Sequence, residues 1–103
     1  IPKSYVKEFT RNWLGLLVQE NSERFARSNR LTTSKGMVVV EVVPNSASGR
    51  IGINPGDIIR QMNQKPVNNE EDYNKAVAEI NNPDRILLLV QRGRQGYYVT
   101  LEP

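Results

Sequence analysis

The chain lacks the side chains that nucleophilic catalysis usually requires. Its 103 residues include no histidine and no cysteine. Ser46 and Ser48 lie in the short segment NSASG, but a serine hydroxyl becomes a good nucleophile only when a neighbouring base removes its proton, and no imidazole is present to do so. We therefore expect that this chain is not an enzyme. Metal sites of thiolate or imidazole ligands are excluded in the same way, and we expect no metal and no cofactor.

Two adjacent carboxylates, Glu70 and Glu71, allow two interpretations. Paired acids could divide general acid and general base work between them. They also follow Asn68, a residue type that caps helices, and Glu71 stands three positions after it, as in a capping box. Negative charge is favourable in the first turn of a helix. We interpret the pair as charges at a helix N-terminus.

The charge balance is basic, with 14 Lys and Arg against 11 Asp and Glu and a net charge of +3. Basic chains can bind nucleic acid. The cations are spread along the chain, however, and the densest pair is Arg92 and Arg94. Tyr97 and Tyr98 are the aromatic residues beside them that could stack on bases. A nucleic-acid-binding β-barrel therefore stays a remote alternative to an ordinary solvated surface.

Length and hydropathy indicate one globular domain. Apolar residues make up 38% of the chain, and no apolar run approaches the ~20 residues of a membrane helix. The first residues lack the basic and apolar segments of a signal peptide. The abrupt ends, IPKS and LEP, lead us to expect a piece of a longer protein.

Strand patterns alternate with short helices along the chain. The β-branched run Met37–Val43 is the clearest predicted strand. The other expected strands are Trp13–Gln19, Asp57–Met62, Arg85–Gln91 and Tyr97–Leu101. Before the first of these strands, Ile1–Thr10 is expected to be an extended lead-in or linker. A short, weak helix is expected at Asn21–Arg30, and one helical turn between Asn45 and Gly52.

Asn68–Ile80 carries the strongest helical pattern. Tyr73, Ala76, Val77 and Ile80 recur at the spacing of one apolar helix face. The order of elements predicts an α+β fold, a small and partly open β-barrel or sandwich of five to six strands with two to three helices.

Gly15 interrupts the apolar run Trp13–Val18. Glycine weakens a strand because it packs no side chain and costs backbone entropy. It is found there when the strand bulges or when a ligand or another backbone approaches closely. The glycine therefore marks the start of this strand as a candidate site.

Three motifs follow one another in the sequence: RNWLGL at Arg11–Leu16, a stretch ending in NPGDII at Val43–Ile59, and NQKPV at Asn63–Val67. Together they resemble the PDZ domains of HtrA/Deg-type serine proteases. The resemblance implies a PDZ domain over residues 11–103, in the circularly permuted bacterial form, with residues 1–10 leading in from a preceding protease domain. Asn12 stands where that family has glycine, so we expect the loop backbone to differ.

The resemblance also implies a ligand. In PDZ domains, backbone N–H groups before this strand bind the terminal carboxylate of a peptide, as an anion nest. Here the donors would be Leu14, Gly15 and Leu16, with Arg11 adding positive charge. The peptide would add as an extra strand by β-augmentation.

The expected groove has two walls. Alternation would place Leu14, Leu16 and Val18 on one face of the strand. The opposite wall would consist of the helix residues Tyr73, Val77 and Ile80. Such a groove favours an apolar last residue in the ligand. Tyr73 takes the place of a histidine that other PDZ domains use to select Ser or Thr two residues earlier, so we expect an apolar or relaxed preference there.

The family resemblance leads to the hypothesis of a substrate-binding module. It would capture free apolar C-termini or unfolded segments for an extracytoplasmic, bacterial periplasmic serine endopeptidase, without nucleic acid and without membrane insertion. Tail-processing peptidases, site-2-type metalloproteases and secretion-system components also contain PDZ domains, so another parent protein stays an alternative.

Overall fold

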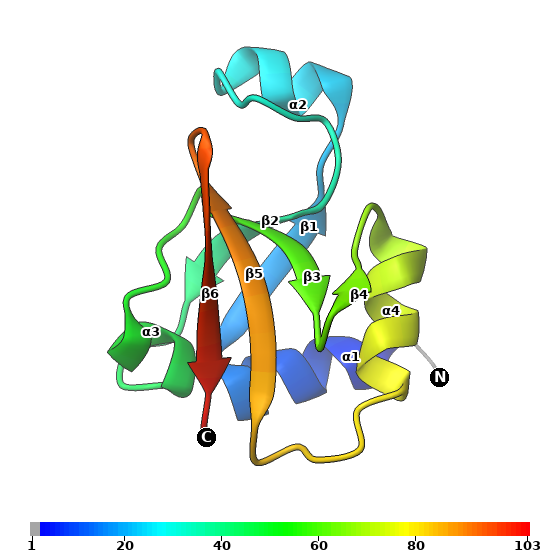
Figure 1. The fold of residues 1–103 in the computed structure, drawn as a ribbon, viewed down its shortest axis with the longest axis vertical. Helices are drawn as coiled ribbons and strands as arrows, with labels where there is room; N and C mark the ends of the chain where they lie inside the picture. The colour runs from blue at the N-terminus through cyan, green and yellow to red at the C-terminus, as the bar shows by residue number, and fades with distance from the viewer. Residues whose placement is uncertain (1–2) are drawn as a thin grey trace.

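The computed structural model of the chain describes residues 3–103 (Figure 1). Its elements, in order, are the helix α1 (Lys3–Phe9), the π-helix η1 (Thr10–Leu14), β1 (Leu16–Glu20), α2 (Glu23–Ser28), β2 (Met37–Val42), α3 (Ala47–Ile51), β3 (Ile58–Met62), β4 (Lys65–Pro66), α4 (Glu70–Ala78), β5 (Ile86–Arg92) and β6 (Gln95–Leu101).

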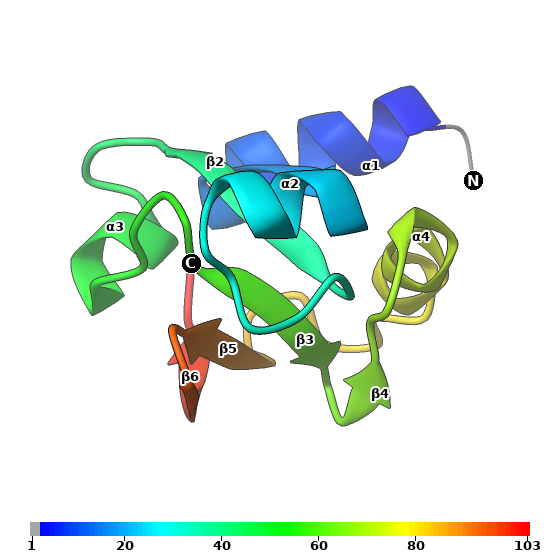
Figure 2. The same ribbon diagram turned by 90° about the horizontal axis from the view of Figure 1, so that it is seen from above.

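The strands form one antiparallel, six-stranded sheet in the order β1-β2-β3-β5-β6, with β4 paired to β3. The strand β1 is therefore at one edge, paired on one side alone. The helices α3 and α4 lie on opposite sides of the molecule, and α1 crosses its base (Figures 1 and 2). The predicted α+β class and the number of strands, five to six, are confirmed, while the circular permutation stays a prediction.

The core is a single apolar cluster beneath the sheet. The helix α4 contributes Tyr73, Ala76 and Val77 to it, which confirms three residues of the apolar stripe expected from the sequence. The fourth, Ile80, packs against the cluster from beyond the end of the helix, which stops at Ala78. Alternate residues of β5, Ile86, Leu88 and Val90, are all buried in the same cluster, as expected for a strand with one face on the core.

Two expectations for the N-terminal segment are wrong. Residues 3–10 are not extended: Lys3–Phe9 is a helix, and Val6 enters the core with 3% of its surface exposed. The first strand does not begin at Trp13, because Thr10–Leu14 continue the helical winding as a π-helix. With four α-helices and a π-helix, residues 3–103 contain more helices than the two to three expected.

The helix α4 begins one residue later than its capping pattern predicted. Asn69, not Asn68, is the N-cap residue, and its side chain accepts a hydrogen bond from Asp72 N–H at 2.8 Å. Three acidic residues do occupy the first turn, where the helix dipole favours them. The position of this cap fixes where α4 starts opposite β1.

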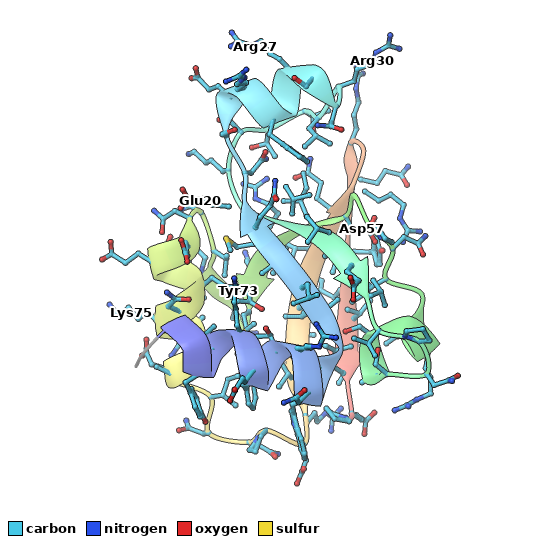
Figure 3. All side chains as sticks on the ribbon, turned by 180° about the vertical axis from the view of Figure 1, so that it is seen from behind. Glu20, Arg27, Arg30, Asp57, Tyr73 and Lys75 are labelled. Atoms are coloured by element: carbon cyan, nitrogen blue, oxygen red, sulfur yellow. The ribbon has the colours of Figure 1, made fainter. Side chains whose placement is uncertain are left out.

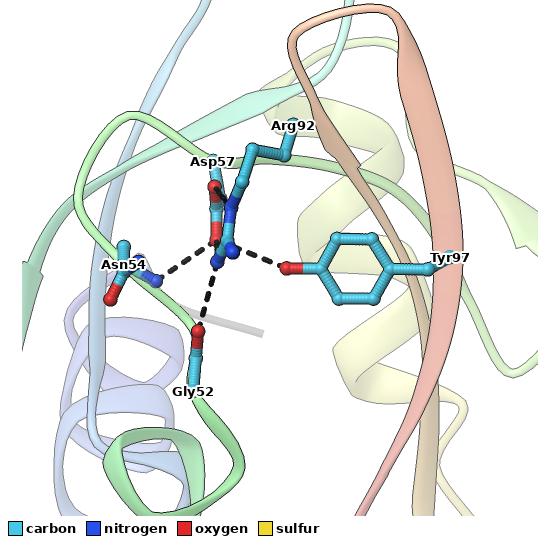
Figure 4. A network of polar contacts seen from close by, with 5 residues as sticks. All are labelled: Gly52, Asn54, Asp57, Arg92 and Tyr97. Atoms are coloured by element: carbon cyan, nitrogen blue, oxygen red, sulfur yellow. Dashed lines mark hydrogen bonds and ion pairs between the residues drawn. The ribbon is translucent and has the colours of Figure 1, made fainter.

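A buried carboxylate ties the turn before β3 to the β5–β6 hairpin (Figure 4). Asp57 is 2% exposed and accepts hydrogen bonds from Arg92 Nε and Nη2, both at 2.8 Å, and from Asn54 N–H at 2.9 Å. The hydroxyl of Tyr97 donates to it at 3.3 Å. The bonded Asp57 raises the pKa of Arg92, and burial first, then the Asp57 charge, raises the pKa of Tyr97. These bonds satisfy the carboxylate, so the network is structural.

Candidate functional site

A pocket of about 480 Å³ lies between β1 and α4. Leu17 and Val18 of β1 line one side, and Glu70, Tyr73 and Asn74 of α4 line the other. The pocket is completed by Met37 of β2 and by Val6, Lys7 and Thr10 of the N-terminal helices. Figure 3 shows Tyr73 between α4 and the strands, above α1. The walls of the pocket are therefore a sheet edge and a facing helix.

Two of the six predicted groove residues, Val18 and Tyr73, line this pocket. Leu14, Leu16 and Val77 are buried in the core cluster, and Ile80 packs against that cluster beyond the end of α4. The expectation that Leu14 shares a strand face with Leu16 and Val18 is wrong, because Leu14 lies in η1. Whether the remaining residues face a ligand stays a prediction.

The pocket includes Leu17, which the alternation rule placed on the other face. The pairing of β1 with β2 shifts register between Leu17 and Val18, which is the signature of a β-bulge. A bulge allows successive side chains to turn toward the same side. Nothing in the sequence marked this position. Val6, Lys7 and Thr10 were missed for another reason: their segment was expected to be extended.

Gly15 has a structural role at the end of η1. Its φ of +83° is left-handed, and an added Cβ would overlap the side chain of Ser46. Its N–H donates to Thr10 O at 2.8 Å, and its carbonyl accepts from Val43 N–H at 2.8 Å. The close approach expected at this glycine therefore exists, with Ser46 at the start of α3 as the neighbour. Its N–H, a predicted carboxylate donor, is bonded within the chain.

Leu16 begins the open edge of β1 and is fully buried. Because Val43 N–H bonds to Gly15 O, Leu16 and Val42 form a non-hydrogen-bonded pair, and the backbone groups of Leu16 point away from β2. The π-helix η1 packs against β1 at this point. Exposure then rises along the strand, and Gln19 and Glu20 are exposed. The accessible part of the edge is thus residues 17–20.

We call the end of the pocket nearest Leu16 the lower end and the end nearest Glu20 the upper end. The lower end is covered by α1, and α1 packs against α4. Val6 joins the core there, and Phe9 packs against it. Burial raises the pKa of Tyr73 well above its usual value, while the Thr10 side chain acts to lower that pKa. The Tyr73 hydroxyl is buried without a well-formed hydrogen bond. This end is tightly packed but has one unsatisfied polar group.

The upper end is bridged by a single side chain. Glu20 Oε1 accepts a hydrogen bond from Glu70 N–H at 2.7 Å, which links the end of β1 to the first turn of α4. A carboxylate at the N-terminus of a helix is favourable because the backbone N–H groups there lack helical partners. Glu20 is exposed, so this bridge is accessible to solvent.

Other predicted residues lie near the lower end. Arg11 is exposed in η1, and its part in carboxylate binding stays a prediction. Trp13 is 39% exposed, and its Nε1–H donates to Pro83 O at 2.6 Å, which ties η1 to the loop before β5. Of the residues on which the nucleic-acid alternative rested, Arg92 and Tyr97 are bonded to Asp57, and the guanidinium lies 5.5 Å from the Tyr97 ring centre.

Two further features of the described residues concern metal binding and membrane insertion. Across residues 3–103, no group of three or more acidic side chains is arranged to hold a metal ion. Over the same residues, none of the helices combines the length and the apolar character needed to cross a bilayer.

The PDZ domain family model matches residues 4–91. The chain is 31% identical over 91 residues to a probable periplasmic serine endoprotease DegP-like of Chlamydia pneumoniae, covering 87% of this chain and 18% of that protein. It is 35% identical over 71 residues to the periplasmic pH-dependent serine endoprotease DegQ of Escherichia coli, covering 69% and 16%. It is also 33% identical to serine protease HTRA3 of Rattus norvegicus, covering 96% and 22%. The chain thus spans about a fifth of the length of these relatives.

Solved structures agree with this. The HtrA3 PDZ domain bound to a phage-derived ligand, FGRWV, is similar with a TM-score of 0.72 and 30% identity, covering 87% of this chain and 82% of that one. The HtrA-type protease AlgW with a decapeptide gives a TM-score of 0.75 and 28% identity, covering 87% and 28%.

Proposed function

Because the chain belongs to the PDZ domain family, we propose that it is a peptide-binding module that takes up a ligand segment as an extra strand on the edge of β1. The observation that carries the proposal is the position of β1 at the end of the sheet order, facing α4 across a pocket lined by both apolar and polar side chains. Main-chain bonds to such an edge give affinity, and side-chain pockets give specificity. Two similar proteins whose structures contain a phage-derived ligand and a decapeptide support this mode.

The ligand proposed is a C-terminal or unfolded apolar segment. Its terminal carboxylate would meet the backbone N–H groups at Leu14, Gly15 and Leu16, with Arg11 nearby. Since the Gly15 N–H is bonded to Thr10 O, capture of a carboxylate requires the last turn of η1 to open. A segment that binds along residues 17–20 alone does not require this step.

The parent protein proposed is a serine endoprotease of the HtrA type, in which this domain recognises substrates and leaves hydrolysis to another part of the chain. The names of the similar proteins support it. The word "periplasmic" in two of those names supports an extracytoplasmic location.

The test is a titration with a ten-residue peptide ending in three valines, as the free acid and as the C-terminal amide, followed by amide NMR shifts and Trp13 emission. We expect binding of the free acid with Kd between roughly 1 µM and 1 mM, with shifts at Leu17 and Val18. Loss of binding in the amide supports the carboxylate nest, and equal binding supports uptake of internal segments.

A pair of variants locates the site. Val18→Gln places a polar group in the pocket and should weaken binding about tenfold, whereas Val40→Gln, at an exposed position of β2, should not. Absence of shifts along β1 with both forms of the peptide would refute the proposal.

A further inference from the structure

The net charge of the molecule is concentrated beyond the upper end of β1. The β1–β2 connection, residues 21–36, holds four cations, Arg24, Arg27, Arg30 and Lys35, against one acid, Glu23. Its charge of +3 equals that of the whole chain, so the remaining residues balance one another. Although cations occur all along the sequence, the surplus of positive charge lies in one connection, whose helix α2 stands apart from the sheet (Figure 1).

These four cations are exposed, and none of them forms a side-chain hydrogen bond or ion pair with another residue of the described chain. Two cations elsewhere do have acidic partners: Lys65 pairs with Glu79 at 2.9 Å and Arg92 with Asp57 at 2.8 Å. Figure 3 shows Arg27 and Arg30 pointing outward above the end of β1. The unpartnered charge is therefore available to a ligand.

The direction of β1 connects this charge to the proposed peptide site. The accessible edge, residues 17–20, leads directly to Ser22, the N-cap of α2. A ligand strand that pairs antiparallel with β1 runs the other way, so its N-terminal part leaves the groove beside α2. Because paired strands advance at the same rise of about 3.3 Å per residue, a ligand that ends opposite Leu16 passes Glu20 about four residues earlier.

From this geometry we infer that α2 and the connection that follows it form a second ligand subsite, selective for acidic residues about five to eight positions before the end of the segment held in the groove. The inference rests on the proposed peptide function. Acidic side chains there would meet the guanidinium groups of Arg27 and Arg30, which suit carboxylates because of their planar, multiply donating geometry. Glu20, whose carboxylate bonds to Glu70 N–H, separates this subsite from the apolar pocket.

The test compares two decapeptides with the same three C-terminal valines, one with four aspartates and one with four serines at positions two to five, which lie eight to five positions before the end. At low ionic strength we expect the acidic peptide to bind about fivefold more tightly, since each exposed ion pair is weak and several act together. The difference in affinity between the two peptides should nearly disappear at ~0.3 M salt, because salt screens exposed charges strongly at that concentration.

Matched variants assign the effect. Arg27→Gln with Arg30→Gln should remove the advantage and leave the affinity for the serine peptide unchanged. Lys75→Gln with Arg85→Gln removes two exposed positive charges elsewhere and should keep it. Figure 3 shows Lys75 on α4, well away from α2. Thermal melts check that both doubly substituted proteins fold.

Each other outcome overturns the inference in a distinguishable way. Equal binding of the two peptides rejects the acidic subsite and leaves the proposed function intact, whereas failure of both peptides rejects the two together. If the acidic peptide binds Val18→Gln as tightly as the wild type, while the serine peptide binds it about tenfold more weakly, the cations form an independent anion-binding patch. If the Arg27 and Arg30 substitutions instead reduce binding to phosphatidylglycerol vesicles without changing either peptide affinity, the surface faces a membrane.

Discussion

The two ends of β1 differ in how many of their backbone and side-chain groups already make contacts within the domain. At the lower end, η1 and α1 bury Leu16, occupy the Gly15 N–H and place Val6 in the core. At the upper end, Gln19 and Glu20 are exposed, and the Glu20 carboxylate accepts a hydrogen bond from Glu70 N–H of α4. The end that the family resemblance marks as the carboxylate site is thus the more completely packed one. A ligand that binds there must replace contacts within the domain, whereas a ligand at the upper end can contact side chains that are already exposed.

The largest effect expected is at Gly15. Gly15→Ala should lower the free energy of unfolding by about 3 kcal/mol, from the left-handed backbone at ~1–2 kcal/mol plus displacement of Ser46. Gly52→Ala is the matched control, since Gly52 has a φ of +93° with nothing within 4 Å of an added Cβ. It should cost only ~1–2 kcal/mol. Urea denaturation measures both, and equal losses would show that the Ser46 contact does not matter.

Val6→Ala tests the packing of α1. Removing two buried methyl groups should cost about 2 kcal/mol. If α1 must move before a carboxylate can bind, the same change should also tighten binding of the free-acid peptide several-fold. Glu8→Ala, at an exposed position of the same helix, should do neither. An unchanged peptide affinity in Val6→Ala would separate α1 from ligand binding.

Tyr73→Phe should stabilise the domain at neutral pH by about 1 kcal/mol, because it removes a buried hydroxyl without a well-formed hydrogen bond. The raised pKa of Tyr73 adds a pH signature. Above the ordinary tyrosine pKa of about 10, the unfolded chain releases this proton while the folded one retains it, so stability falls as pH rises. Denaturation between about pH 9 and 11 should show a steeper loss for the wild type than for Tyr73→Phe.

The smallest effect belongs to the upper end. Glu20→Ala removes the carboxylate that bonds to Glu70 N–H and should cost about 0.5 kcal/mol. Glu41→Ala, at an exposed position of β2, serves as the control. Amide exchange at Glu70 should become faster in Glu20→Ala alone. A loss as large as that of Gly15→Ala would mean that the two ends are equally tightly held.

The sequence predicted the elements whose patterns are local. The β-branched run Met37–Val42 and the apolar stripe of α4 depend on neighbours along the chain and are confirmed. The errors concern residues whose conformation depends on distant contacts. Lys3–Phe9 is a helix of seven residues, too short to be stable alone, and it is stabilised by Val6 packing against the core. The β-bulge at Leu17 and the π-helix likewise produce no hydrophobic periodicity from which they could be predicted.

The open edge of β1 also affects how the domain behaves with copies of itself. An unpaired strand is a template for edge-to-edge association. Here only residues 17–20 are accessible, the bulge between Leu17 and Val18 interrupts their register, and Glu20 would bring like charges close together in an antiparallel pair. A ligand of extended chain can follow this bent, short edge, but a second rigid copy would meet it over too few residues to pair. The same irregularity that hid Leu17 from sequence prediction should therefore hinder self-association at the proposed binding edge.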